Sequence, residues 1–287
     1  MYLLFNEKYY ADCAISVDRI RINFELSQKI CETIRSNDNS IDHLINAPIT
    51  YDARNSDYIK GSYKFYDSTD HMSALMFYLK VSNNGFIEFN PNKLFNCCGA
   101  LEAVCDFLNK CAVWKCQRFD IAIDLPTDFS ELTPIKDNRN LMMYVRSFKK
   151  DNYTVYWGSK RNAIGTAKMY NKALESGMDK PLTRIELTVG NKDEKGWINK
   201  LHNTYPIVFR KSKEIEQNAK LTKTDKAFIR LFNSCGDKSE AIAAFCLLDR
   251  KKRDKLQPYI HGDKIYFEKY DDIICEVIDR MIEILSD

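Results

Sequence analysis

Segment 117–125 carries the residues whose types and spacing best suit metal and phosphate chemistry. Its alternation is typical of a strand, with apolar side chains on one face and Arg118, Asp120, Ala122 and Asp124 on the other. Two carboxylates on one strand face are expected about 7 Å apart, at about 3.3 Å per residue, so they could share a hydrated divalent cation. A solvent-facing strand surface with an Arg–Asp pair explains the same residues equally well.

Two further strand-like segments, 167–172 and 184–189, repeat this alternation. Their polar faces carry Lys168, Tyr170 and Lys172 in one segment, and Arg184, Glu186 and Thr188 in the other. If the three strands are neighbours, their carboxylates suit Mg²⁺ or Mn²⁺ and their lysines and arginines suit a phosphate. Tyr170 is then a candidate nucleophile on phosphorus, although its ordinary pKa of about 10 requires cationic neighbours for a phenolate. Since the chain has 16 tyrosines, a purely structural Tyr170 is the alternative.

Other site chemistries find little support in the sequence. The four histidines include no His-hydrophobe-His pair, which argues against a histidine-metal nuclease. The ten cysteines include no Cys-x2-Cys pair, so we expect reduced, mostly buried thiols and no standard zinc site. Gly158-Ser159-Lys160 lacks the spacing of a phosphate-binding P-loop.

Strands and turns dominate the first two thirds of the chain. Alternation predicts strands over 15–26, 58–67, 74–81, 86–89, 117–125, 153–157, 167–172 and 184–189. Helical spacing predicts helices over 27–35, 99–111 and 141–148. Because long helices do not separate the strands regularly, we expect an α+β fold with an antiparallel central sheet and flanking helices.

After about residue 191 the pattern becomes mostly helical. Helices are predicted over 197–202, 211–220, 225–232, 239–248 and 271–285. We therefore expect a sheet-based catalytic domain over 1–192 and a helical C-terminal region over 193–287 that serves DNA binding or dimerisation. Basic stretches at 210–230 and 250–255 could hold phosphates, or could be solvated helix faces.

Composition places the chain among ordinary globular proteins. It has 287 residues, 45% of them hydrophobic, and a net charge of +3. No run of 18 apolar residues predicts a membrane span, and the first residues do not resemble a signal peptide. We expect a cytoplasmic protein without a membrane partner.

The chain resembles the replication initiation factor family of the Rep_trans type, the rolling-circle replication initiators of plasmids and phages. The resemblance lies in four ordered segments: RFDIAIDL at 118–125, TVYWGSKRN at 154–162, AKMYNKALE at 167–175 and RIELTV at 184–189. The upstream pieces DRIRINFEL, GSYKFYD and FIEFNPNKL fit the same family. In all, the similarity covers about residues 15–190.

This resemblance implies an HUH-endonuclease-like palm and a metal-dependent nicking and strand-transfer enzyme with a covalent 5′-phosphotyrosine intermediate. It implies these roles: Tyr170 as nucleophile; Lys172, Arg118 and Arg184 as phosphate-stabilising groups; Asp124, Glu186 and Asp120 as ligands of Mg²⁺ or Mn²⁺; Lys168, Lys160 and Arg161 as DNA contacts. Glu175 matches an acidic position of the family and could simply pair with a lysine. The implied partners are origin DNA (the double-stranded origin and the single-stranded nick site), a second copy of the chain and a host helicase.

Alternatives stay open at this point. A conjugative relaxase of the same fold would share the chemistry, and a DNA-binding protein that does not cut would share the fold alone. A metal-dependent nuclease that uses water would leave Tyr170 structural. If another tyrosine is the nucleophile, Tyr156 and Tyr153 are next in line.

Overall fold

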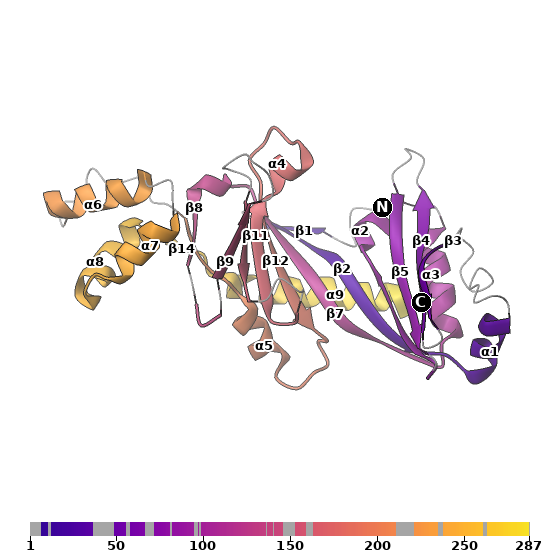
Figure 1. Cartoon of the computed structure of the whole chain (residues 1–287). Coiled ribbons are helices and arrows are strands. Elements are labelled where there is room, and N and C mark those ends of the chain that lie inside the picture. The colour runs from indigo at the N-terminus through magenta and orange to yellow at the C-terminus, as the bar shows by residue number, and fades with distance from the viewer. Residues whose placement is uncertain are drawn as a thin grey trace.

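A large antiparallel sheet dominates the computed structural model (Figure 1). The structure describes residues 7–10, 13–36, 49–55, 58–66, 72–80, 82–94, 97, 99–135, 137–139, 141–145, 153–158, 163–210, 221–234, 238–260 and 263–286. The sheet has eleven strands in the order β3-β4-β5-β6-β2-β7-β12-β11-β10-β9, with β1 paired to β2. Every strand pairing is antiparallel, so the predicted α+β fold with an antiparallel sheet is confirmed.

The elements have the following bounds. The strands of the large sheet are β1 (Glu7–Tyr10), β2 (Cys13–Glu25), β3 (Ile49–Asn55), β4 (Tyr58–Tyr66), β5 (Met72–Lys80), β6 (Asn84–Phe89), β7 (Val113–Leu125), β9 (Leu141–Val145), β10 (Tyr153–Trp157), β11 (Thr166–Asn171) and β12 (Thr183–Gly190). A second sheet contains β8 (Leu132–Ile135), β13 (Ile207–Arg210) and β14 (Asp263–Lys264). The helices are α1 (Gln28–Ser36), α2 (Pro91–Leu94), α3 (Ala100–Lys110), α4 (Lys172–Ser176), α5 (Trp197–Thr204), α6 (Lys223–Ser234), α7 (Lys238–Cys246), α8 (Arg250–Ile260) and α9 (Asp271–Ser286). Two 3-10 turns, η2 (Phe129–Glu131) and η3 (Phe267–Tyr270), precede β8 and α9.

The two longest strands, β2 and β7, lie side by side at the centre of the sheet. Each has 13 residues, and the pairing between them joins the half that contains β3–β6 to the half that contains β9–β12. Alternate β7 side chains, such as Phe119, Ile121 and Ile123, are fully buried on one face. That apolar alternation explains why these segments form central strands.

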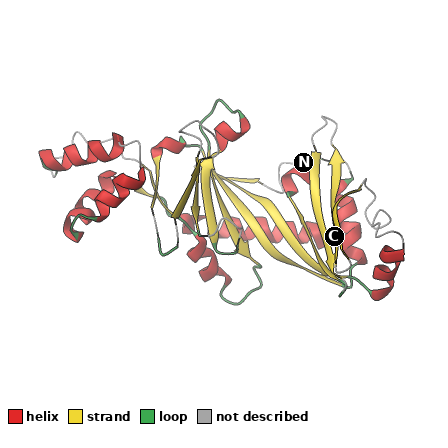
Figure 2. Ribbon diagram, in the orientation of Figure 1, coloured by secondary structure: helices red, strands yellow, loops and turns green. Residues whose placement is uncertain are grey.

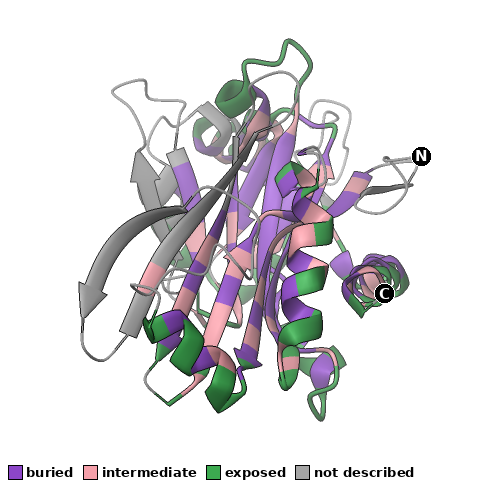
Figure 3. Ribbon diagram, turned by 90° about the vertical axis from the view of Figure 1, so that its right-hand side faces the viewer, coloured by how far each residue is buried: buried purple, intermediate pink, exposed green. Residues whose placement is uncertain are grey.

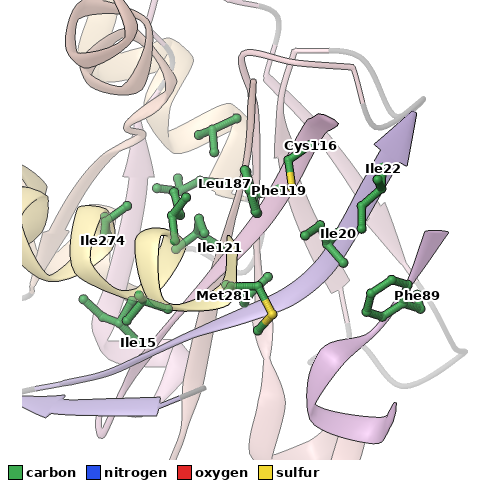
Figure 4. Close-up of a cluster of buried hydrophobic side chains, with 14 of the residues drawn as sticks. Ile15, Ile20, Ile22, Phe89, Cys116, Phe119, Ile121, Leu187, Ile274 and Met281 are labelled. Atoms are coloured by element: carbon green, nitrogen blue, oxygen red, sulfur yellow. The ribbon is translucent and has the colours of Figure 1, made fainter. Parts of the chain in front are cut away.

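Helices cover the apolar face of the sheet (Figure 2). The C-terminal helix α9 runs across it and contacts β2, β7 and α3. Ile274 and Met281 of α9 are fully buried and belong to the same cluster as Ile15, Ile121 and Leu187 of the strands (Figure 4). Burying a side chain of this size contributes about 1.5–3 kcal/mol, so α9 is an integral part of the main core.

Helices α6, α7 and α8 share a smaller hydrophobic cluster. Its buried members are Leu221, Ile229, Phe232, Ala241, Phe245, Leu256 and Ile260. A polar link also joins two of these helices, because Asp225 of α6 accepts a hydrogen bond from Lys255 of α8 at 2.6 Å. The division into two domains between residues 192 and 193 stays a prediction. Within the predicted C-terminal region, α9 packs in the main hydrophobic cluster, whereas α6–α8 pack in the smaller one.

Two local predictions need comment. The helix predicted over 141–148 is wrong, because residues 141–145 form β9 and pair with β10. Short apolar runs suit either structure, and here the available partner strand decides. The basic stretch 250–255 begins helix α8, which periodicity did not predict. The helix predicted over 211–220 lies outside the described residues.

The cysteines behave as reduced thiols in the described part of the chain. Eight described cysteines are thiols outside any disulfide, and four of these are buried: Cys13, Cys31, Cys97 and Cys116. Burial raises the pKa of the Cys111 and Cys116 thiols to about 12, which makes these two unreactive. Cys246 of α7 is exposed, unlike the mostly buried thiols that the sequence predicts.

No helix among the described residues is long and apolar enough to cross a bilayer.

Candidate functional site

The strand register brings the predicted site residues together on the face opposite the helices. In one row across the sheet, Asp124 of β7 lies opposite Arg184 of β12, which lies opposite Tyr170 of β11. In the adjacent row Ala122 lies opposite Glu186, and Glu186 lies opposite Lys168. The condition that these three strands be neighbours, with their polar faces on one side, is therefore met.

Tyr170, Glu186 and Lys168 form a compact cluster. The Tyr170 hydroxyl donates a hydrogen bond of 2.6 Å to Oε1 of Glu186. Lys168 Nζ lies 2.5 Å from the other oxygen of the same carboxylate and 5.4 Å from the Tyr170 ring centre. Glu186 is 4% exposed and Tyr170 is 5% exposed, so this cluster is shielded from bulk water.

The surroundings hold Tyr170 in its protonated form. Burial raises the pKa of the Tyr170 hydroxyl well above its ordinary value, and the negative charge of Glu186 raises it further. The nearby Arg184 acts in the opposite direction but does not outweigh these effects. A phenolate therefore forms here only if Glu186 takes the proton and a cation compensates the new charge.

Arg184 is held by two carboxylates beside this cluster. Its guanidinium makes two parallel hydrogen bonds to Asp124, both of 2.7 Å, and a third of 3.0 Å to Asp18. Such bidentate contacts fix the plane of the guanidinium. Asp18 lies where the β2–β7 register shifts between Val17 and Arg19, an irregularity typical of a β-bulge that re-aims a side chain.

A second group of charges surrounds Asp120 further along β7. Arg118 and Arg19 lie 3.7 Å and 3.6 Å from the Asp120 carboxylate. Glu88 of β6 accepts hydrogen bonds from Arg118 at 3.0 Å and Arg21 at 2.7 Å. Asp120 is 4% exposed, and its Oδ1 has no hydrogen-bond partner. Burial raises the pKa of this carboxyl, although Arg118 and Arg19 partly offset the effect.

The ion pairs on this face balance in charge. The acidic members are Asp18, Glu88, Asp120, Asp124 and Glu186; the basic members are Arg19, Arg21, Arg118, Lys168 and Arg184. Five charges of each sign are paired within short distances, and several side chains are nearly buried. Figure 3 shows that buried residues fill the central strands of the sheet. We call these ten residues the charged network.

The three predicted metal ligands do not converge in this arrangement. Asp124 is paired with Arg184, and Asp120 lies beside the neighbouring arginines. Glu186 is paired with Lys168 and accepts a hydrogen bond from Tyr170. The expected separation of about 7 Å along β7 is wrong, since Asp124 lies four positions after Asp120, which at about 3.3 Å per residue is roughly 13 Å. Across the described residues, no three Asp, Glu, His or Cys side chains gather as a metal site. The residues as arranged do not fit a bound Mg²⁺ or Mn²⁺.

Some predicted residues lie outside the charged network. Lys172 begins α4 and pairs with Glu175 at 2.8 Å, so the expectation that Glu175 pairs with a lysine is confirmed. Lys160 and Arg161 lie outside the described residues. Tyr156 of β10 lies opposite Lys168, which keeps it on the same face as Tyr170.

Sequence reasoning missed four members of the network: Asp18, Arg19, Arg21 and Glu88. A signal for three of them was present, because Arg19 and Arg21 alternate with apolar residues in β2 and Glu88 lies between Ile87 and Phe89. The pairing of β2 with both β6 and β7 was not readable, and that pairing brings these charges to the site.

Comparisons with known proteins give few matches. No family model matches the chain, and no curated protein matches it. The solved structures include a rolling circle replication initiator protein from Geobacillus stearothermophilus, with 12% identity and a TM-score of 0.38. The alignment covers 72% of this chain and 89% of that one. A similarity at this level carries no argument about function.

Proposed function

We propose that this protein initiates rolling-circle DNA replication by nicking one DNA strand, with Tyr170 as the nucleophile. The observation that carries the proposal is the hydrogen bond of 2.6 Å from the Tyr170 hydroxyl to Glu186. A tyrosine, a carboxylate base and a lysine meet at one point, as a phosphoryl-transfer site with a protein nucleophile requires. The order of the family-like segments around Tyr170 supports the same conclusion.

In the proposed step, Glu186 accepts the phenolic proton while the Tyr170 oxygen attacks phosphorus. The new bond joins the tyrosine oxygen to phosphorus, and the bond from phosphorus to the 3′ oxygen breaks. The products are a 5′-phosphotyrosine and a 3′ hydroxyl, with a water or acidic group supplying the proton of the leaving oxygen. Since the pKa of Tyr170 is raised in the resting protein, proton transfer accompanies attack rather than preceding it.

Cations of the charged network would stabilise the transferring phosphate. Lys168 and Arg184 lie next to the reacting hydroxyl and would offset the charge that develops on the phosphoryl oxygens. Asp124 is assigned a positioning role, because it fixes the guanidinium of Arg184. Incoming phosphate must compete with Glu186 and Asp124 for these cations, so the ion pairs rearrange when DNA binds.

Mg²⁺ or Mn²⁺, a second copy of the chain and a host helicase belong to the same proposal. They come from the family resemblance. If a metal ion is used, Asp124 and Glu186 would hold it, which requires that both release their present cations. The steps described above are those of the protein's own side chains.

The direct test is an adduct assay on a labelled origin-bearing single strand. Products are separated on a denaturing gel before and after protease digestion, with Mn²⁺ or with EDTA. We expect a protein-linked fragment that carries the DNA 3′ of the cut, is lost in Tyr170→Phe and persists in Tyr156→Phe, while DNA binding is retained in both. An adduct that survives in Tyr170→Phe would assign the nucleophile to another tyrosine.

A second candidate function is DNA binding without cleavage. Two observations favour it: Tyr170 is nearly buried, and every carboxylate of the network already has a cationic partner. In that case the same gel shows no cleavage on any origin tested. Cleavage without an adduct would instead identify water as the nucleophile. A conjugative relaxase would give the same adduct, and only its DNA substrate would differ.

A further inference from the structure

A hollow of about 460 Å³ lies on the sheet where β5, β6, β2 and β7 adjoin. Its lining includes Arg21 and Asn23 of β2, Tyr78 of β5, Phe86 of β6 and Lys115 of β7. None of these five residues belongs to the Tyr170 cluster, although Arg21 also belongs to the charged network. We call this feature the aromatic hollow.

Aromatic rings form one wall of the hollow. Tyr78 and Phe86 lie directly opposite each other in the β5–β6 pairing, and their rings stack at 5.2 Å with an angle of 18°. The guanidinium carbon of Arg21 lies 4.3 Å from the centre of the Phe86 ring. Tyr78 and Phe86 are half-buried, so aromatic carbon faces the hollow from a rigid sheet.

Gly85 lies next to this wall, at a point where the backbone is crowded. A Cβ at this position would lie 2.2 Å from the carbonyl oxygen of Tyr78 and 2.5 Å from the Phe24 ring. Both distances are far shorter than a van der Waals contact, so only glycine lets β5, β6 and the Phe24 ring approach this closely. In the β5–β6 register, Gly85 pairs with Leu79, directly next to the Tyr78–Phe86 pair.

The described lining of the hollow is cationic. It contains Arg21, Lys80 and Lys115 and the single carboxylate of Glu25. Because Arg21 is already paired with Glu88, the positive charge that faces the hollow comes mainly from the two lysines. Lys80 and Lys115 are exposed at the rim. Cations beside planar aromatic groups are the arrangement with which proteins bind single-stranded nucleic acids, since phosphates meet the cations and bases meet the rings.

The geometry points to the aromatic hollow as a binding site for unpaired bases of single-stranded DNA. A duplex keeps the faces of its bases stacked inside the helix and has none to offer to the rings, whereas a single strand can insert a base. Strand β7 runs from Lys115 at the hollow to Asp124 beside Tyr170, nine residues or on the order of 30 Å. DNA held in the hollow could thus follow the same face toward the nucleophile. That the strand is DNA rests on the proposed function, whereas the chemistry of the hollow does not.

Binding of a fluorescein-labelled oligothymidylate to the full chain tests this site. Oligothymidylate contains no origin, so the measurement does not depend on nicking. We expect Tyr78→Ala and Phe86→Ala each to weaken binding about 5- to 150-fold, the range for loss of one stacked base. The control is Tyr266→Ala, because Tyr266 is an exposed aromatic side chain beside a lysine, Lys264, and lies outside the hollow.

A charge variant keeps the test decisive if an aromatic variant fails to fold. Lys115→Ala is expected to reduce the slope of log affinity against log salt by about 0.7, and Lys264→Ala to leave it unchanged. Wild-type affinity in both the aromatic and the lysine variants would overturn the inference, and so would an equal loss of affinity for a duplex of the same length. Weakened oligothymidylate binding without nicking on any origin would support the hollow and argue against the proposed nicking. Normal nicking by the wild type, with oligothymidylate binding unaffected in the variants, would support the proposed nicking and argue against the hollow as a binding site.

Discussion

Glu186 connects more of the proposed chemistry than any other described residue. It accepts the hydrogen bond of Tyr170, pairs with Lys168 and is nearly buried. A carboxylate in this position can act as a general base, and it also suppresses premature ionisation of the phenol. If the protein does not cut DNA, the same contacts give Glu186 a purely structural role. Substitution of Glu186 therefore distinguishes a general base from a structural residue.

We expect Glu186→Gln to slow nicking about 10²- to 10⁴-fold, because glutamine keeps the shape of the side chain but cannot take the proton. The rate of adduct formation with a labelled origin strand measures this effect. Glu194→Gln is the matched control, since Glu194 is exposed and pairs with Lys200 outside the charged network. Equal rates for Glu186→Gln and the wild type would remove Glu186 from the mechanism.

The buried carboxyl group of Asp120 is expected to make the free energy of unfolding depend on pH. Its folded pKa is raised, mainly by burial, so its contribution to stability is full below the unfolded pKa of about 3.9 and is lost as the pH rises through the folded pKa. Asp120→Asn removes this loss. The stability of the variant relative to the wild type should therefore be greater at pH 7 than at pH 4.

Thermal unfolding of both proteins at the two pH values measures this difference. Asp106→Asn, on the exposed side of α3, controls for the loss of one surface charge. If the advantage of Asp120→Asn is the same at both pH values, burial of the carboxylate does not limit stability.

At the scale of elements, the N-terminus of α6 is fixed by a reciprocal pair of contacts. The Thr222 amide donates to the Asp225 carboxylate at 3.0 Å, and the Asp225 amide donates to the Thr222 hydroxyl at 3.1 Å. This arrangement is a capping box with aspartate in the acidic position. Lys255 of α8 completes it, so one carboxylate both caps α6 and joins two helices.

Asp225→Asn is expected to destabilise the α6–α8 cluster at pH 7 by about 1.5–3 kcal/mol, the range for hydrogen bonds to a charged group. The hydrogen bond from Lys255 is the main reason that the pKa of Asp225 is lowered to about 2. A lowered folded pKa gives stability that is present above the unfolded pKa and is lost as the pH falls toward 2. The difference between variant and wild type should shrink over that interval.

Amide hydrogen exchange in α6 measures the local effect. Asp254→Asn is a suitable comparison, because Asp254 is exposed on α8 and pairs only loosely with Arg250 at 3.8 Å. Unchanged exchange rates in α6 for Asp225→Asn at pH 7 would show that the cap and the Lys255 contact contribute little.

At the scale of the whole molecule, α9 joins the two ends of the chain. It packs on β2 near the N-terminus and on β7 in the middle, and its buried side chains lie in the main cluster (Figure 4). Helix α9, which has 16 residues, is therefore a necessary part of the core. This core supports the charged network from the opposite face of the sheet.

We expect Ile274→Ala in α9 to destabilise the protein by about 2–5 kcal/mol, the usual cost of such a cavity in a core. Ile198→Ala is the matched control, because Ile198 of α5 is 42% exposed and its loss leaves no buried cavity. Chemical denaturation of both variants gives the two free energies. Similar small losses for both would mean that α9 is only loosely attached.

The sequence by itself determined the faces of the strands and hence the candidate site. Alternation in segments 117–125, 167–172 and 184–189 assigned Asp124, Tyr170 and Glu186 to polar faces, because side chains of a strand point to opposite sides in turn. It also predicted an antiparallel α+β fold. These features depend on residues close together in the chain, which is why they were readable.

Only the tertiary structure decided which charges meet. Register pairs Tyr170 with Arg184 and Lys168 with Glu186, the bulge at Asp18 adds a carboxylate, and the β2–β6 pairing adds Glu88. Strand alternation fixes the face of a side chain but not its neighbour on the next strand, since a shift in register changes every cross-strand pair. The same is true of β9, whose apolar sequence suits helix or strand until β10 provides a partner, and of the aromatic hollow, which requires four strands to lie in one order.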